Sequence, residues 1–123
     1  MTPLFGLSET TLEEVRRVFF RHRKIAKAVI YGSRAKGNYK PGSDIDLTLF
    51  ACDGEEISPR DLVDILDEID ELLLPYTVDL SAFAALDHAK LREHIDRVGQ
   101  VFYERGRGDG EDQGVAAKAA KTQ

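Results

Sequence analysis

One segment constrains the fold more than any other, because it places an amphipathic helix between two short apolar runs. Apolar residues recur at helical spacing from 62 to 73, and acidic residues occupy the opposite face of that helix. Ser58 followed by Pro59 is typical of a helix start, since serine caps the first turn and proline suits its first position. The runs 44–50 (DIDLTLF) and 76–80 (YTVDL) predict a strand on each side of the helix.

The rest of the chain repeats this alternation of helices and strands. Thr10 with Glu13, or Thr11 with Glu14, predicts a capping box at the start of a first helix. The remaining expected elements are a helix over 8–23, a strand over 26–31, a helical turn over 33–36, a helix over about 87–98 and a strand over 100–104. This order predicts an α/β fold with a small mixed β-sheet and helices packed on one side.

The length of 123 residues suits one domain. We expect residues 1–105 to form that domain. Residues 106–123 contain a single valine as their only large apolar residue, so they cannot bury enough apolar surface to offset the entropy of ordering. We therefore expect a disordered tail.

The composition excludes several classes of protein. A net charge of −5 argues against direct, sequence-independent binding of nucleic acid, which depends on Lys and Arg contacts to phosphate. The single cysteine, Cys52, cannot form an internal disulfide. The N-terminal residues do not resemble a signal peptide, and no apolar run approaches the roughly 20 residues that span a bilayer. We expect a cytoplasmic protein without a membrane segment.

Gly32 and Ser33 stand at the junction between a predicted strand and a predicted helical turn. Backbone N–H groups at such a turn lack partners within the helix, and glycine lets an anion approach the backbone closely. The pair therefore outlines a phosphate-binding site. Taken alone, a Gly-Ser pair after a strand is more often an ordinary turn, because it is not specific for phosphate.

Asp44 and Asp46 form the second candidate feature. On a strand, residues two apart project from the same face, so the two carboxylates should converge. Two like charges about 4 Å apart repel by roughly 4 kcal/mol at an effective dielectric of 20, so a cation should lie between them. Mg²⁺, held by one or two carboxylates and by substrate phosphates, suits that position. The alternative is a solvated strand end.

Asp79 is the third candidate. It lies within a short apolar strand between Val78 and Leu80, whose side chains should face a core. A carboxylate in that setting is costly unless it is paired or binds a metal. If this strand lies beside 44–50, Asp79 joins the other two aspartates. An exposed position at the sheet edge is the alternative.

Together these residues read Gly32-Ser33, ten residues, Asp44-Ile45-Asp46, and a later aspartate on a strand. This pattern resembles the nucleotidyltransferase superfamily that includes DNA polymerase beta, whose signature is G-S-x10-D-x-D. The stretches YGSRAKG (31–37) and GSDIDLTLF (42–50) are typical of its small members. The resemblance covers about residues 8–105 and implies the polymerase beta-like nucleotidyltransferase fold.

The resemblance also implies a reaction. A nucleoside monophosphate would pass from a nucleoside triphosphate to a hydroxyl group, with release of pyrophosphate. The implied metal ligands, for two Mg²⁺ ions, and catalytic residues are Asp44, Asp46 and Asp79, and the implied nucleotide contacts are Gly32, Ser33, Arg34 and Ser43. Lys36 and Lys40, like Arg34, either add positive charge near the phosphates or are solvated loop cations.

Larger relatives carry a second domain for the acceptor, and this chain has no room for one. It is similar to the minimal nucleotidyltransferases (MNT), which pair with all-helical HEPN toxins in toxin–antitoxin modules and transfer AMP from ATP to a toxin tyrosine. The resemblance thus implies ATP as donor, a HEPN partner and a hetero-oligomer. Two alternatives stay open: a non-catalytic antitoxin, and transfer to a small molecule such as an aminoglycoside. The basic cluster between Arg16 and Lys27 is interpreted as a solvated face rather than a binding surface.

Overall fold

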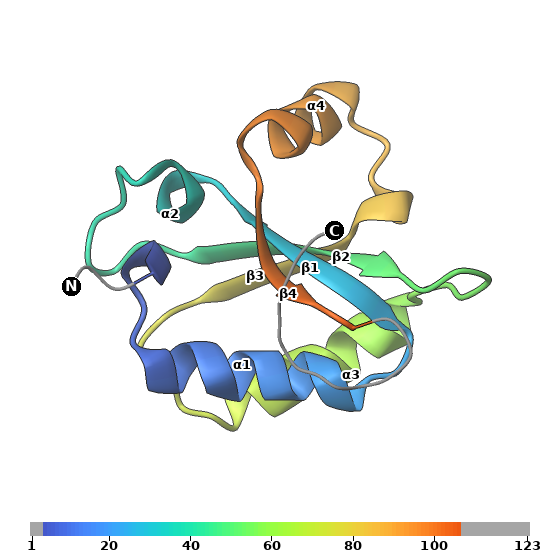
Figure 1. Cartoon of the computed structure of the whole chain (residues 1–123), viewed down its shortest axis with the longest axis horizontal. Helices are drawn as coiled ribbons and strands as arrows, with labels where there is room; N and C mark the ends of the chain where they lie inside the picture. Colours follow the sequence, from blue (N-terminus) through green and yellow to red (C-terminus); the bar gives the residue numbers. More distant parts are fainter. Residues whose placement is uncertain (1–3, 107–123) are drawn as a thin grey trace.

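The computed structural model describes residues 4–106 and contains one four-stranded sheet in the order β3-β2-β1-β4 (Figure 1). Its elements are η1 (Leu4–Gly6), α1 (Glu9–Arg21), β1 (Ile25–Tyr31), α2 (Ser33–Lys36), β2 (Ile45–Ala51), α3 (Pro59–Asp70), β3 (Val78–Ala82), η2 (Phe83–Ala85), α4 (Ala89–Val98) and β4 (Gln100–Glu104). β1 runs antiparallel to β2 and β4, whereas β2 and β3 are parallel. The predicted small mixed sheet in an α/β fold is confirmed.

Helix α3 connects the two parallel strands and begins where the sequence indicates. The Ser58 side chain accepts a hydrogen bond from the Asp61 backbone N–H, and the Asp61 carboxylate accepts one from the Ser58 N–H. Pro59 lies in the first turn of α3, next to this capping box. Both unpaired N–H groups are thus satisfied locally, which explains why this boundary could be predicted.

The start of helix α1 differs from the prediction. Ser8 is the N-cap, and its Oγ accepts a hydrogen bond from the Thr11 backbone N–H at 3.1 Å. The predicted capping boxes with Thr10 or Thr11 as the cap are therefore wrong. Both threonines lie inside the helix, which begins at Glu9.

The main core lies between the sheet and helices α1 and α3, which cover the same face (Figure 1). Phe19 of α1 is fully buried and packs edge-on against the Phe102 ring of β4. Helix α4 lies on the other side of the sheet, where Ile95 is buried. The two long helices thus share one face as expected, and the shorter α4 covers part of the other.

The predicted tail, 106–123, lies outside the described residues except for Gly106. Within the described range, no helix has both the length and the apolar character needed to cross a bilayer.

Candidate active site

Two of the three predicted aspartates face each other across neighbouring strands. Asp46 of β2 pairs in register with Asp79 of β3, and on its other side Asp46 pairs with Tyr31 of β1. Residues in register on adjacent strands project from the same face of a sheet. The parallel pairing of β2 with β3 therefore brings together two carboxylates that are 33 positions apart in the chain.

Asp44 lies at the junction between the preceding loop and β2. The strand begins at Ile45 rather than at Asp44, so strand pairing fixes Asp46 but leaves Asp44 exposed at the strand end. The Ile45 backbone N–H donates to the Thr77 carbonyl at 2.9 Å. This bond holds the backbone between the two aspartates against the segment that leads into Asp79.

We call Asp44, Asp46 and Asp79 the carboxylate row. Their electrostatics favour a bound cation. Burial raises the pKa of the Asp46 carboxyl above its usual range, and the negative charges of Asp79 and Asp44 raise it further. Protonation relieves this repulsion, and so would a bound metal ion. Asp46 is half-buried while Asp79 is exposed, so the site opens to solvent on the β3 side.

Tyr31 lies beside the carboxylate row, and the sequence patterns did not single it out. Burial raises the pKa of its hydroxyl, and the charges of Asp79 and Asp46 act in the same direction, while a hydrogen bond with the Ser81 side chain opposes them. The Ser81 hydroxyl in turn donates to Thr48 Oγ1 at 2.9 Å. Only the strand register reveals that Tyr31 lies beside the carboxylates.

Gly32 is required by the geometry next to Asp46. Its φ is +80°, a left-handed conformation that residues with a Cβ rarely adopt. A Cβ built on Gly32 would also lie 2.5 Å from the Asp46 Oδ2 atom. The backbone therefore passes directly against the carboxylate, and helix α2 starts at Ser33 immediately beyond it.

Arg34 is buried, with only 2% of its surface exposed. Its Nη1 donates to the Phe5 carbonyl at 2.9 Å, while Nε and Nη2 donate to the carbonyls of Ser43 and Pro41. Its guanidinium also lies over the rings of Tyr39 and Tyr76. The interpretation of Arg34 as a solvated loop cation is therefore wrong, because the side chain ties the loop before Asp44 to the N-terminal turn.

Ser43 has a comparable place in this loop. Its hydroxyl accepts a hydrogen bond from the Lys40 N–H at 2.8 Å, and its own N–H donates to the Lys40 carbonyl. The exposed side chains of Lys36 and Lys40 stand apart from these contacts. Arg34 and Ser43 thus support the loop that carries Asp44, and their contact with a nucleotide stays a prediction.

No group of three His, Cys, Asp or Glu side chains within residues 4–106 is close enough together to hold a metal ion by itself. Mg²⁺ usually binds through one or two carboxylates together with substrate phosphates and water, so a complete protein cage is not needed. The metal and catalytic roles of Asp44, Asp46 and Asp79 stay predictions.

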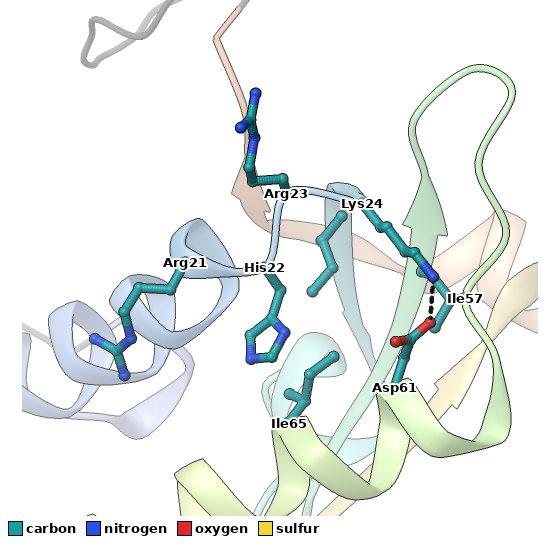
Figure 2. A pocket seen from close by; sticks show the side chains of 8 residues that line it. Arg21, His22, Arg23, Lys24, Ile57, Asp61 and Ile65 are labelled. Atoms are coloured by element: carbon teal, nitrogen blue, oxygen red, sulfur yellow. Dashed lines mark hydrogen bonds and ion pairs between the residues drawn. The ribbon is translucent and has the colours of Figure 1, made fainter.

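Residues 21–24 of the basic cluster line part of a different cavity, of about 210 Å³, near the N-terminal end of β1 (Figure 2). Lys24 forms an ion pair with Asp61, while Arg21 and His22 both contact Glu68. These contacts fasten the end of α1 to α3. Arg21, Arg23 and Lys24 stay exposed, which agrees with the predicted solvated face.

The fold and the row of carboxylates define a class of protein. A family model described as polymerase beta, nucleotidyltransferase matches residues 13–108, which is most of the chain. The chain therefore belongs to the polymerase beta-like nucleotidyltransferase family. No curated protein matches the sequence significantly.

Several solved structures share the fold. A toxin–antitoxin structure with AMP-PNP aligns over 80% of this chain and 74% of that chain, at 18% identity and a TM-score of 0.60. A complex of tri-AMPylated HEPN toxin with MNT antitoxin from Shewanella oneidensis aligns over 78% and 71%, at 13% identity and a TM-score of 0.59. The toxin–antitoxin pair MntA–HepT aligns over 79% and 73%, at 13% identity and a TM-score of 0.58. At these identities the likeness concerns the fold.

Proposed function

We propose that this chain transfers AMP from ATP to a tyrosine hydroxyl of a HEPN-type toxin and so acts as the antitoxin of that pair. The observation that carries the proposal is the pairing of Asp46 with Asp79, with the Gly32 backbone directly against Asp46. The similar structures add support, because one contains AMP-PNP and another an AMPylated HEPN toxin. The cytoplasm is the proposed compartment.

The residues present fit Mg²⁺. Asp44, Asp46 and Asp79 offer only carboxylate oxygens, which magnesium prefers. Burial and the charges of Asp79 and Asp44 raise the pKa of the Asp46 carboxyl, and a cation beside it would offset this effect. When bound, Mg²⁺ would neutralise the phosphates and stabilise the entering and leaving oxygens of the displacement. The proposed ligands are these three aspartates.

Gly32 and Ser33 would hold the terminal phosphates of ATP. The first N–H groups of α2 have no acceptor one turn earlier within the helix, and the Ser33 hydroxyl adds a donor. Because Gly32 has no side chain, the phosphates can approach both this turn and Asp46. Arg34 and Ser43 fix the loop that presents Asp44, and we propose that they also contact the nucleotide.

Asp79 would accept the proton of the acceptor hydroxyl. It is exposed on the outermost strand, so a side chain from another protein can reach it. The acceptor oxygen attacks the α-phosphorus of ATP, the bond to the β-phosphate oxygen breaks, and pyrophosphate leaves. The product is AMP joined to the acceptor oxygen.

The test uses ATP labelled at the α-phosphate, Mg²⁺ and a HEPN-type protein as acceptor, sought first in the neighbouring gene. We expect label on a tyrosine of that protein, and loss of labelling in the double variant Asp44→Asn/Asp46→Asn. The control is Asp53→Asn/Asp87→Asn, which removes two exposed carboxylates outside the row. This control should label the partner like the unmodified chain.

Three results would contradict the proposal in different ways. Full toxin neutralisation by Asp44→Asn/Asp46→Asn would indicate a non-catalytic antitoxin. Label recovered on an aminoglycoside, and not on protein, would indicate transfer to a small molecule. Label that remains in ATP under every condition would exclude nucleotidyl transfer.

A further inference from the structure

A groove of about 550 Å³ lies between the end of helix α3 and the segment that leads into β3. Its walls combine half-buried apolar side chains such as Leu66, Leu74 and Val78 with polar ones such as Asp67 and Asp70. A surface hollow with a few apolar side chains and charged residues at its rim can receive a side chain from another molecule.

Leu73 stands at this groove with 87% of its surface exposed. Its φ is +57°, in the left-handed region that a residue with a branched side chain rarely adopts. Leu73 is hardly buried by the fold, and its backbone adopts an unfavourable left-handed conformation. A contact outside the chain would explain both features.

The acidic residues of α3 and its C-terminal turn fall into two groups. Asp61, Asp64 and Glu68 form ion pairs with Lys24, Arg60, Arg21 and His22. By contrast Asp67, Asp70 and Glu71 are exposed and form no ion pair with any residue in the described range 4–106. Asp67 and Asp70 line the groove. Its rim therefore complements Lys or Arg side chains of another molecule.

The groove adjoins the strand that carries Asp79. Its wall includes Thr77, whose carbonyl accepts the hydrogen bond from the N–H of Ile45, between Asp44 and Asp46. Val78, also in the wall, is the residue before Asp79. Val78 and Asp79 lie on opposite faces of β3, and β3 is an edge strand. A partner that spans this edge would touch the groove and reach Asp79 together.

We propose that this groove docks the protein acceptor, which inserts an aliphatic side chain beside Leu73 and places Lys or Arg side chains against Asp67 and Asp70. The proposal rests on the proposed function, since it assigns the groove to the same HEPN-type partner. Partner binding and nucleotidyl transfer can be tested with separate variants, because the groove residues do not belong to the carboxylate row.

The first variant is Leu73→Asn. Asparagine adopts the left-handed conformation more readily than leucine and the site buries little, so the thermal midpoint should not fall. We expect the Kd for the HEPN-type protein that serves as acceptor to rise about ten- to hundredfold, as for loss of one buried leucine contact. The affinity for ATP with Mg²⁺ should not change. Val63→Asn is the matched control, since Val63 is 50% exposed on α3 outside the groove.

The second variant, Asp67→Lys/Asp70→Lys, tests the charge of the rim. We expect it to weaken partner binding most strongly at low salt, because like charges are screened as ionic strength rises. Unchanged partner affinity in both variants would overturn the docking proposal. So would light scattering that shows a dimer of this chain alone, dissociated by Leu73→Asn, because the groove would then receive a second copy.

Failure of docking and failure of the proposed function give different results. Label transfer to the partner with no effect of either variant would leave the function standing and remove the docking site. Loss of partner binding in both variants, with no label transfer by the unmodified chain, would support the docking site and remove the proposed reaction.

Discussion

Replacing Arg34 by alanine should destabilise the fold strongly, although Arg34 belongs to a helix of only four residues. The change removes three hydrogen bonds from a guanidinium that is 2% exposed. It also leaves a space between the rings of Tyr39 and Tyr76. The loop before Asp44 would then lose its main connection to the N-terminal turn.

The magnitude follows from the three acceptors. The Phe5 carbonyl is bonded in a buried position, so it would lose its partner without gaining water, at a cost of about 1–3 kcal/mol. The carbonyls of Ser43 and Pro41 are partly exposed and can rehydrate, which limits each loss to about 0.5–1.5 kcal/mol. Relief from burying one cation offsets part of the sum. We expect a loss of about 3 kcal/mol, or roughly 12 °C or more in thermal midpoint for a domain of this size.

Thermal and urea unfolding of the chain without nucleotide would measure this loss. Lys36→Ala is the control, because it removes an exposed cation from the same helix and should change stability by less than about 0.5 kcal/mol. Arg34→Lys should recover only part of the loss, since one ammonium cannot reach three carbonyls in different directions. If the midpoint of Arg34→Ala fell by less than about 4 °C, the assignment of Arg34 as the anchor of this loop would be refuted.

Three further predictions concern Asp46, Asp61 and Gly32. The raised pKa of Asp46 means that its ionisation disfavours the folded state, so its favourable contribution is complete below its unfolded pKa and is lost as pH rises through the folded one. Without metal, Asp46→Asn should therefore melt at a higher temperature than the unmodified chain at pH 7, and this difference should vanish by about pH 3. The pKa of Asp61 shifts in the opposite direction, because its hydrogen bonds to Ser58 and Lys24 lower it to about 2. Asp61→Asn should lower the thermal midpoint at pH 7, with a difference that shrinks as the pH falls through this value; an effect independent of pH would contradict the assignment. Gly32→Ala should abolish detectable binding of ATP with Mg²⁺ in calorimetry, since its Cβ would displace the Asp46 carboxylate, and unimpaired binding would show that this close approach is not needed.

The sequence by itself determined the features that depend on neighbours along the chain. The start of α3 could be predicted because Ser58 and Asp61 satisfy each other's N–H groups within one turn. The strand β2, the turn after Gly32 and the spacing from Gly32-Ser33 to Asp44 and Asp46 were equally local. Resemblance to a family then supplied the reaction, and the family match confirmed the class of protein.

Only the tertiary structure decided which distant residues meet. The sequence left open whether the strand with Asp79 lies beside β2, because strand pairing depends on hydrogen bonds between segments separated by a whole helix. The sequence also did not reveal that Tyr31 lies beside the carboxylate row. Nor did it reveal the acceptors of Arg34, which include the carbonyl of Phe5, 29 residues away. A basic side chain in a short helical turn normally stays solvated. The burial of Arg34 follows from carbonyls and aromatic rings that only the folded chain brings around it.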